Sequence, residues 1–291
     1  MKEKIICILV LYNPVENILQ SNIEAVIDQV DYLWISDNTP GGFHGIQKLI
    51  APQSQKIHYA LMDGNVGIAK AQNAGIRFAI ESNYDFVFFL DQDSISPEGL
   101  IDGLKKELLK LEEKGLKVGG VGPQPFNRDT GRPYLANISK GNIVKSNVRE
   151  VDQLISSASL IRTYMFQDVG LMDEKLFIDC VDFELCWRAK FNAEYRFFMV
   201  TSLLLSHHLG EGDKCFMGIS VKVPTPFRIY YQYRNYFYLV RRKSTPIYWS
   251  ISNGVKFICK YFYYPLMCKN GSDYFRNINS GIWHGITHKI G

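Results

Sequence analysis

The residues best suited to chemistry are two aspartates, Asp91 and Asp93, which are separated by Gln92. They directly follow the apolar run 86–90, which has the length and aromatic content of a buried strand. Open α/β sheets bind ligands at the carboxyl ends of their strands, and adjacent carboxylates repel each other unless a cation lies near them. The pair therefore predicts a cation and ligand site, although Asp-X-Asp also occurs in ordinary solvated turns.

Polar side chains also follow the other strands expected before this motif. The apolar patterns predict strands at 5–12, 32–36 and 57–62, and helices at 15–30 and 68–81. This alternation predicts a mostly parallel, helix-covered sheet whose strands end at one edge. The positions expected at that edge are Tyr12, Asn13, Asp37, Asn38, Asn65, Gly67, Asp91 and Asp93.

Two of these loops carry specific expectations. Asp37 closes the second strand, where a carboxylate suits a ribose hydroxyl or a base N–H. Taken alone, Asp37-Asn38 is better explained by an ordinary Asx turn. The loop 64–67 would let the backbone approach a phosphate at the start of the next helix. It is neither a Walker loop nor a dinucleotide fingerprint, because it lacks their residues and spacing.

More acids lie at an expected helix start. Asp182 is expected as the N-cap or a first-turn residue, with Glu184 two positions later. Because residues two apart do not share a helix face, one acid should face a cavity and the other should cap the helix or pair with Arg188. Attraction to the helix dipole is the alternative for one or two of these acids. Further along, His207 and His208 follow an apolar strand at 195–205, where a metal ligand and a structural histidine are equally expected.

The charge distribution sets the C-terminal part apart. Residues 211–291 contain twelve Lys or Arg and three Asp or Glu, so the chain, +4 overall, is acidic before them. Basic residues there alternate with aromatic ones; Tyr230, Arg234 and Arg241 would share one helical stripe. Such helices suit a membrane headgroup interface, and packing on the domain is the alternative.

The remaining composition is that of a globular, cytosolic protein. Six cysteines among 291 residues show no Cys-X-X-Cys pair, so we expect reduced thiols. No signal-peptide pattern precedes the first strand, and no apolar run has the ~20 residues that a spanning helix needs. The length fits one large α/β domain with additions, or two small domains.

Together these blocks resemble the inverting, metal-dependent nucleotide-sugar glycosyltransferases of family two, which have the GT-A fold. Within that family the similarity is greatest to bacterial rhamnosyltransferases of O-antigen and capsule assembly. The matching blocks are Leu11–Pro14, Asp37-Asn38, Gly64–Ala69 with Asn73, Leu90–Ser94, Gly170–Glu174 with Phe177–Asp179, and His207–Gly210.

The resemblance implies a role for each matching position. Asp37 would hold the base of a dTDP- or UDP-sugar, and Asn65 and Asp91 the nucleoside or sugar. Asp93 would bind Mg²⁺ or Mn²⁺ on the diphosphate, with His207 or His208 as a further ligand. Asp182 would be the general base. The other donor-side positions are Tyr12, Asn13, Gly67, Asn73 and Gln92, and the acceptor-side positions are Ser157, Asp179 and Glu184.

The resemblance also implies an organisation. An α/β GT-A catalytic domain with a Rossmann-like, mixed and mostly parallel sheet would span 1–225, with a donor half to about residue 122 and an acceptor half at 123–225. Residues 226–291 would form C-terminal aromatic and basic helices that associate with a membrane surface, placing the protein in the cytoplasm on the inner face of the cell membrane.

The implied reaction transfers L-rhamnose from dTDP-β-L-rhamnose to a hydroxyl of a lipid-linked saccharide. One alternative is a UDP-sugar donor such as UDP-galactofuranose. Another is a non-catalytic GT-A binding module held at a membrane or polyanion. Nucleic acid is not an expected partner, because no recognised binding motif occurs.

Overall fold

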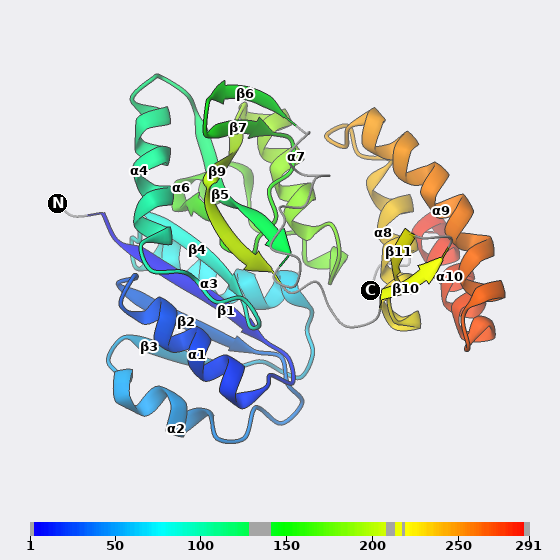
Figure 1. Ribbon diagram of the computed structural model, residues 1–291, viewed down its shortest axis with the longest axis horizontal. Coiled ribbons are helices and arrows are strands. Elements are labelled where there is room, and N and C mark those ends of the chain that lie inside the picture. The colour runs from blue at the N-terminus through cyan, green and yellow to red at the C-terminus, as the bar shows by residue number, and fades with distance from the viewer. Residues whose placement is uncertain (1–2, 128–140, 208–212, 217–218, 288–291) are drawn as a thin grey trace.

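The computed structural model describes residues 3–127, 141–207, 213–216 and 219–287, without the side chains of 127, 207, 213–216 and 219–222. An α/β body stands beside a unit of three C-terminal helices (Figure 1). The strands of the body end toward that unit, so the polar edge predicted from the sequence faces the helices.

One mixed sheet of nine strands runs through the body in the order β3-β2-β1-β4-β8-β5-β9-β7-β6. Only β7 and β8 in this sheet run against the rest, because their ladders on both sides are antiparallel. The expected mixed, mostly parallel sheet is therefore confirmed. The strands are β1 Ile5–Leu11, β2 Tyr32–Asp37, β3 Ile57–Leu61, β4 Phe86–Asp91, β5 Val118–Asn127, β6 Asn142–Lys145, β7 Val148–Val151, β8 Leu160–Arg162 and β9 Arg196–His207, with a separate ribbon of β10 Asp213–Phe216 and β11 Ile219–Lys222.

Helices cover both faces of this sheet. The body contains α1 Glu16–Ile27, α2 Ile46–Ile50, α3 Ile68–Glu81, α4 Leu100–Glu112, α6 Thr163–Val169 and α7 Val181–Ala193, with short 3₁₀ turns at Ala51–Gln53 and Glu174–Leu176. Side chains of α1, α2 and α4 pack in one core, and those of α3, α6 and α7 in another. The sheet separates the two cores.

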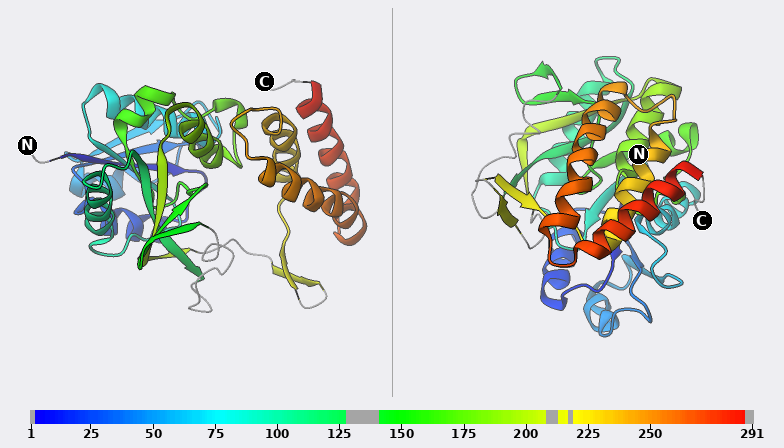
Figure 2. Two further views of the ribbon diagram at one scale, coloured as in Figure 1. Left: turned by 90° about the horizontal axis from the view of Figure 1, so that it is seen from above. Right: turned by 90° about the vertical axis from the view of Figure 1, so that its right-hand side faces the viewer.

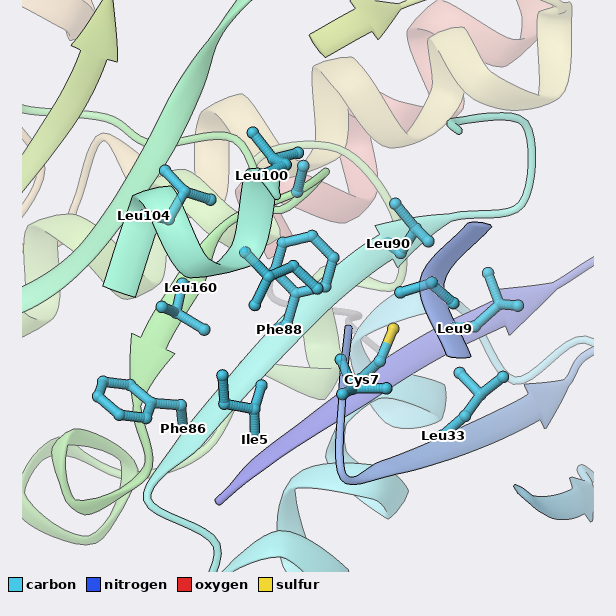
Figure 3. Close-up of a cluster of buried hydrophobic side chains, with 14 of the residues drawn as sticks. Ile5, Cys7, Leu9, Leu33, Phe86, Phe88, Leu90, Leu100, Leu104 and Leu160 are labelled. Atoms are coloured by element: carbon cyan, nitrogen blue, oxygen red, sulfur yellow. The ribbon is translucent and has the colours of Figure 1, made fainter. Parts of the chain in front are cut away.

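Alternation along β1 and β4 explains why these strands are apolar throughout. Cys7 and Phe88 lie in the core with α1 and α4, whereas Ile8 and Phe89 lie in the core with α3 and α7. Successive strand residues point to opposite faces, so a sheet covered on both sides needs apolar residues at every position. Figure 3 shows the first core, with Leu100 and Leu104 of α4 over β4.

Two boundaries differ from those that the sequence predicts, a helix that starts at Ser96 and a loop that starts at Pro123. α4 begins at Leu100, because Gly99 takes a left-handed conformation with φ of +74° within a turn in which the Leu100 N–H donates to the Pro97 carbonyl. β5 continues to Asn127, although a loop was expected from Pro123. The prolines are tolerated because β8 pairs with β5 only at Gly120 and Val121. The expected donor–acceptor division at residue 122 therefore falls inside one strand.

Three helices form the C-terminal unit: α8 Pro226–Leu239, α9 Ile247–Met267 and α10 Gly271–Thr287, the last not expected from the sequence. Figure 2 shows them packed together beside the body. Arg234 of α8 is buried and donates to the carbonyls of Lys175 and Leu176 at 2.5 and 3.0 Å. Arg234 belongs to the helical stripe that was expected to contact lipid headgroups, and it binds the protein instead. No helix in the described ranges is long and apolar enough to span a bilayer.

Candidate functional site

The ends of three parallel strands bring the predicted polar residues together. In the ladders, Leu11 pairs with Asp37 and Val10 pairs with Asp91. Tyr12 follows Leu11, so the segment after β1 lies between the ends of β2 and β4. Because parallel strands end on the same side, these positions share one edge of the sheet.

Hydrogen bonds fix the segment after β1 to both neighbouring loops. The Gln92 side chain accepts from the Tyr12 N–H at 2.7 Å and donates to the Tyr12 carbonyl at 3.1 Å. On the other side, the Asn13 N–H donates to the Thr39 hydroxyl at 2.9 Å. The Tyr12 ring itself is 47% exposed. Gln92 therefore positions Tyr12, whose ring remains available to a ligand.

Asp37 is fully buried and accepts three hydrogen bonds. The donors are the N–H groups of Thr39 and Phe43, at 2.8 and 2.7 Å, and the Tyr59 hydroxyl at 2.7 Å. Burial, together with the Asp37 carboxylate, raises the pKa of Tyr59 to about 12. A carboxylate offers roughly four lone-pair positions, and internal donors occupy three of them here. Its contact with a base stays a prediction.

The loop after β3 is built around Gly67. Its N–H donates to the Asn65 side chain at 3.2 Å, and its carbonyl accepts from Asn38 at 3.2 Å. With φ of +83°, Gly67 also lies so close to Phe177 that a Cβ would be 2.6 Å from that ring. The Phe177 carbonyl accepts from the Ile68 N–H at 2.8 Å. The chain itself therefore fills the position at this helix start where a phosphate was expected.

The turn after β4 holds its two carboxylates on a fixed backbone. Asn22 of α1 donates to the carbonyls of Asp91 and Ser94 at 2.8 and 2.7 Å. The Ser94 hydroxyl lies 3.2 Å from that of Ser157, which links the turn to the expected acceptor side. Asp91 is partly buried, whereas Asp93 is exposed. The two acids thus occupy different environments, with Asp93 the more open to solvent.

Asp182 lies in the first turn of α7, as expected, close to the end of β4. Its carboxylate accepts from the Ser156 N–H at 3.1 Å and from the Phe183 N–H at 2.9 Å. Burial, with a smaller contribution from the charge of Asp91, raises the pKa of Asp182 to about 6, although the hydrogen bonds oppose this. A carboxyl group with a pKa near neutrality suits a general base.

The segment before α7 has an unusual backbone. Phe177, Asp179 and Cys180 have φ of 62°, 66° and 64°. Such conformations cost free energy in non-glycine residues and persist only where their surroundings impose them. Asn235 of α8 helps to hold this backbone conformation, because its amide donates to the carbonyls of Ile178 and Asp179 at 2.7 and 3.0 Å. The C-terminal unit thus shapes the approach to Asp182.

Arg228, in the first turn of α8, also reaches this segment. It forms an ion pair with Asp179, with an Nη2–Oδ1 distance of 2.8 Å. That hydrogen bond, with a smaller effect from the charge of Asp91, raises the pKa of Arg228. Sequence reasoning missed Arg228, because a contact made from a separate helix leaves no local pattern. The predicted acceptor role of Asp179 must therefore accommodate a bound guanidinium.

Asn73 was expected on the donor side, and the structure shows its side chain bonded within the protein. The side chain is buried within α3. Its amide exchanges two hydrogen bonds with the Met172 backbone, at 2.9 and 3.0 Å, and donates to Glu174 at 2.8 Å. Every polar atom of Asn73 is thus engaged inside the protein, where it fixes the loop before α7.

Glu184 was expected on the acceptor side, and the structure shows its side chain paired with two arginines. The side chain is buried and binds Arg188 and Arg242, at 2.9 and 2.5 Å. The expected pairing with Arg188 is confirmed. Two guanidinium groups therefore neutralise Glu184 in the interior, and it does not line the edge where Asp182 lies.

The residues that would hold a metal are only partly described. The side chain of His207, at the end of β9, and the whole of His208 lie outside the described part. Among the residues that the structure describes, no group of three or more His, Cys, Asp or Glu side chains is arranged to hold a metal ion. Asp91 and Asp93 nevertheless provide hard oxygen donors, and a cation on a diphosphate needs only one or two carboxylates. These two residues fit Mg²⁺ or Mn²⁺ carried by a nucleotide.

Comparisons with known proteins agree with this geometry. Residues 6–170 match the model of the family described as Glycosyl transferase family 2. A dTDP-rhamnosyl transferase, RfbF of Shigella flexneri, is 32% identical over 263 residues, which are 88% of this chain and 86% of that protein. The chain belongs to glycosyl transferase family 2. It is a glycosyltransferase.

Solved structures confirm the fold of this family 2 glycosyltransferase. The mannosyltransferase PcManGT of Pyrobaculum calidifontis, in complex with GDP-Man and Mn²⁺, has a TM-score of 0.62 at 11% identity, covering 99% of this chain and 76% of that one. S. aureus TarS 1–349, in complex with UDP-GlcNAc, has a TM-score of 0.58 at 14% identity, covering 99% and 82%. The fold is the GT-A fold that the sequence predicted.

Proposed function

We propose that this enzyme transfers L-rhamnose, with inversion, from dTDP-β-L-rhamnose to a hydroxyl of a lipid-linked saccharide during assembly of a bacterial surface polysaccharide. The observation that carries the proposal is the position of Asp182, a carboxyl group of raised pKa beside Asp91 at the ligand-binding edge. The 32% identity to a protein named as a dTDP-rhamnosyl transferase supports the donor sugar.

On the donor side, the proposal assigns each group by its chemistry. The exposed Tyr12 ring and the remaining lone pair of Asp37 suit a flat base with an N–H donor. Asp91, in the partly buried part of the turn, takes a sugar or ribose hydroxyl. Gln92, Asn13, Asn65 and Gly67 act through the hydrogen bonds that fix the loops.

Proton removal and displacement occur together in the proposed reaction. Asp182 takes the proton of the acceptor hydroxyl as that oxygen attacks the anomeric carbon. The bond from that carbon to the phosphate oxygen breaks, and dTDP leaves from the opposite face. Because the acceptor oxygen attacks the face opposite the departing dTDP, the β-linked donor becomes an α-L-rhamnoside.

A divalent cation would be held by Asp93, with His207 or His208 as a further ligand. When bound, it supplies charge neutralisation for the departing diphosphate. Asp93 suits this role because it is exposed at the end of a fixed turn. Arg228 adds a positive charge near Asp91 and stays protonated, since Asp179 raises its pKa.

The proposal includes a peripheral position on the cytoplasmic face of the membrane. One face of α9 exposes an apolar stripe, made of Ile247, Ile251, Val255, Ile258, Phe262 and Leu266. Their spacing of three or four residues keeps them on one side over about 28 Å of helix. The basic excess of residues 211–291 adds attraction to anionic headgroups. A lipid-linked acceptor would be reached from such a surface.

Donor turnover tests the proposal. Purified enzyme is supplied with Mg²⁺ or Mn²⁺, a lipid-linked saccharide fraction and, in turn, dTDP-rhamnose, UDP-galactofuranose and UDP-GlcNAc. We expect dTDP release with dTDP-rhamnose, loss of release with EDTA, and an α-linked product. Preferred use of a UDP-sugar would refute the donor assignment. No release from any sugar nucleotide would favour a GT-A module that binds without catalysis.

A further inference from the structure

A cavity of about 560 Å³ lies between the catalytic body and the first half of α9. The body side includes Phe183 and the segment 151–155, and its other lining residues are Pro123, Pro125, Gly141 and Met199. Phe183 and the segment 151–155 adjoin the proposed base: residue 155 precedes Ser156, and the N–H groups of Ser156 and Phe183 are the two donors to Asp182. The volume lies within the usual range of ligand pockets, roughly 300–1,000 Å³. The cavity is therefore large enough for a ligand, and its lining includes Phe183 and ends one residue before Ser156, the two donors to Asp182.

The cavity lining combines aromatic rings with polar side chains. Trp249 packs against Trp187 of α7, with ring centroids 4.8 Å apart, and is therefore rigidly held. Phe183 and Tyr248 contribute two further rings, and Asn253 contributes an amide. Flat apolar faces beside a few hydrogen-bonding groups match a sugar ring, which has apolar C–H faces and a rim of hydroxyls.

Two lysines of α9 add positive charge on the same side of the helix. Lys256 lines the cavity, and Lys260 lies one turn further on, near Asp179 and Cys180. At 3.6 residues per turn, both lie opposite the apolar stripe that contains Ile258. The outward face of α9 can thus meet lipid while these lysines face the catalytic body.

These lysines lack fixed anionic partners. Among the side chains that the structure describes, no carboxylate oxygen lies within 4.0 Å of either ammonium group. Like charges one helical turn apart repel each other. Burial, reinforced by the charge of Lys256, lowers the pKa of Lys260. An anion bound beside both lysines would relieve this repulsion.

We propose that this cavity is the acceptor site, with the acceptor saccharide against Trp249 and Phe183 and an acceptor phosphate or diphosphate held by Lys256 and Lys260. The inference rests on the proposed glycosyl transfer, whose acceptor it defines further. A saccharide joined to its carrier through a diphosphate has both features, a neutral ring and an adjacent anion. The acceptor hydroxyl would then lie beside Asp182.

Binding of three probes to the full-length enzyme tests this site. The probes are decyl-diphosphate-linked N-acetylglucosamine, the decyl glycoside of the same sugar without phosphate, and dTDP with Mg²⁺. Titration calorimetry gives each dissociation constant for wild type, Lys256→Glu and Lys269→Glu. Lys269 is exposed just after α9, so its variant carries the same charge change away from the cavity.

We expect wild type to prefer the diphosphate-linked probe, and Lys256→Glu to weaken that probe by at least about tenfold. Lys256→Glu should change the affinities for the other two probes by less than about twofold, and Lys269→Glu should change none. Trp249→Phe, which keeps a ring and protects folding, should weaken both glycan probes modestly.

Two results would overturn the inference. The first is that wild type binds the diphosphate-linked probe no better than the phosphate-free one, or not at all. The second is that Lys256→Glu weakens dTDP binding as much as glycan binding, which would assign Lys256 to the donor diphosphate. These are binding measurements, so an absence of donor turnover would refute the proposed function without deciding this test.

Discussion

Arg242 and Glu184 form a buried ion pair, with an Nη1–Oε1 distance of 2.5 Å. The pair joins the chain after α8 to α7, the helix that carries Asp182. Arg188 binds the same carboxylate, and Arg242 also reaches Asp173. The C-terminal unit is thereby anchored to the helix of the proposed base, so changes at this anchor should affect both stability and catalysis.

Replacing Glu184 by Gln should be strongly destabilising. The Glu184 side chain is 1% exposed, and its loss of charge would leave Arg188 and Arg242 without their shared anion. Breaking one side of a buried ion pair typically costs roughly 3–5 kcal/mol. Urea unfolding at pH 7.5 should show a decrease in the free energy of unfolding of that order.

An ion pair with an exposed lysine provides the control for Glu184. Lys110 pairs with Glu107 at 2.9 Å, and the Lys110 side chain is 53% exposed. Lys110→Ala should therefore cost less than about 1 kcal/mol. Equal effects of the two substitutions would show that the Glu184 cluster contributes no more than a surface pair.

Asp182→Asn should abolish sugar transfer while leaving donor binding intact. An amide cannot take the acceptor proton, and the proposed role of Asp182 involves the acceptor and not the donor. In wild type, the rate should fall about tenfold per pH unit below the pKa of about 6, because the base becomes protonated. A kcat/KM profile and dTDP titrations measure both effects; transfer by the variant would remove Asp182 as the base.

The raised pKa of Asp182 also has a stability consequence of definite sign. The pKa of Asp182 is about 6 in the folded protein and 3.8 in a model compound. The protonated carboxyl group therefore makes its full contribution to the free energy of unfolding below about pH 3.8, and this contribution is lost as the pH rises through 6. Asp182→Asn should therefore be more stable than wild type at pH 8 by about 1–2 kcal/mol. A shift of two pKa units corresponds to ~3 kcal/mol, and the expected effect is smaller because the side chain is partly solvated. Denaturant unfolding at pH 4 should show this difference shrinking; a constant difference would contradict the assignment.

Gly67→Ala should destabilise the protein more than Gly64→Ala. Both glycines have positive φ, +83° and +70°, so both substitutions incur backbone strain. Only at Gly67 does the new Cβ meet another atom, at 2.6 Å in the Phe177 ring, whereas nothing lies within 4 Å at Gly64. We expect Gly67→Ala to cost about 1–2 kcal/mol more in urea unfolding and to lower kcat, because Phe177 begins the segment leading to Asp182. Equal costs would show that Phe177 moves freely.

Phe262→Asp should reduce binding to vesicles that contain anionic lipid. Phe262 lies within the apolar stripe of α9 and is 60% exposed, so the substitution removes apolar contact area and adds a negative charge. Ile143, in β6, is 68% exposed and provides a control outside the C-terminal unit. Cosedimentation should decrease for Phe262→Asp and not for Ile143→Asp. The same loss in both variants would argue against a membrane-binding face on α9.

Local patterns were sufficient for the first half of the fold. Continuous apolar runs marked β1 and β4 because both faces of these strands are covered. Ile68–Glu81 was predicted with its observed bounds, since its apolar residues repeat at helical spacing. Asp37, Asp91 and Tyr12 were correctly placed at one edge, because parallel strands between helices leave little choice of topology.

Contacts between distant segments were not predictable in this way. Arg228 was missed and Arg234 was assigned to a headgroup surface, although they bind segments around residues 175–179. Asn73 and Glu184 matched positions where ligand contacts were expected, and their partners turned out to be internal. A side-chain type and its neighbours in the chain do not reveal which direction the side chain takes after packing.

The sequence by itself determined the sheet edge, its pair of aspartates and the family, because strand periodicity and loop residues are local properties. Only the tertiary structure decided which polar residues remain available for chemistry. Burial and the charge of Asp91 raise the pKa of Asp182, whereas Arg188 and Arg242 neutralise Glu184 two positions later. That difference arises from partners on other elements, and it exists only once α7 and the C-terminal helices have packed together.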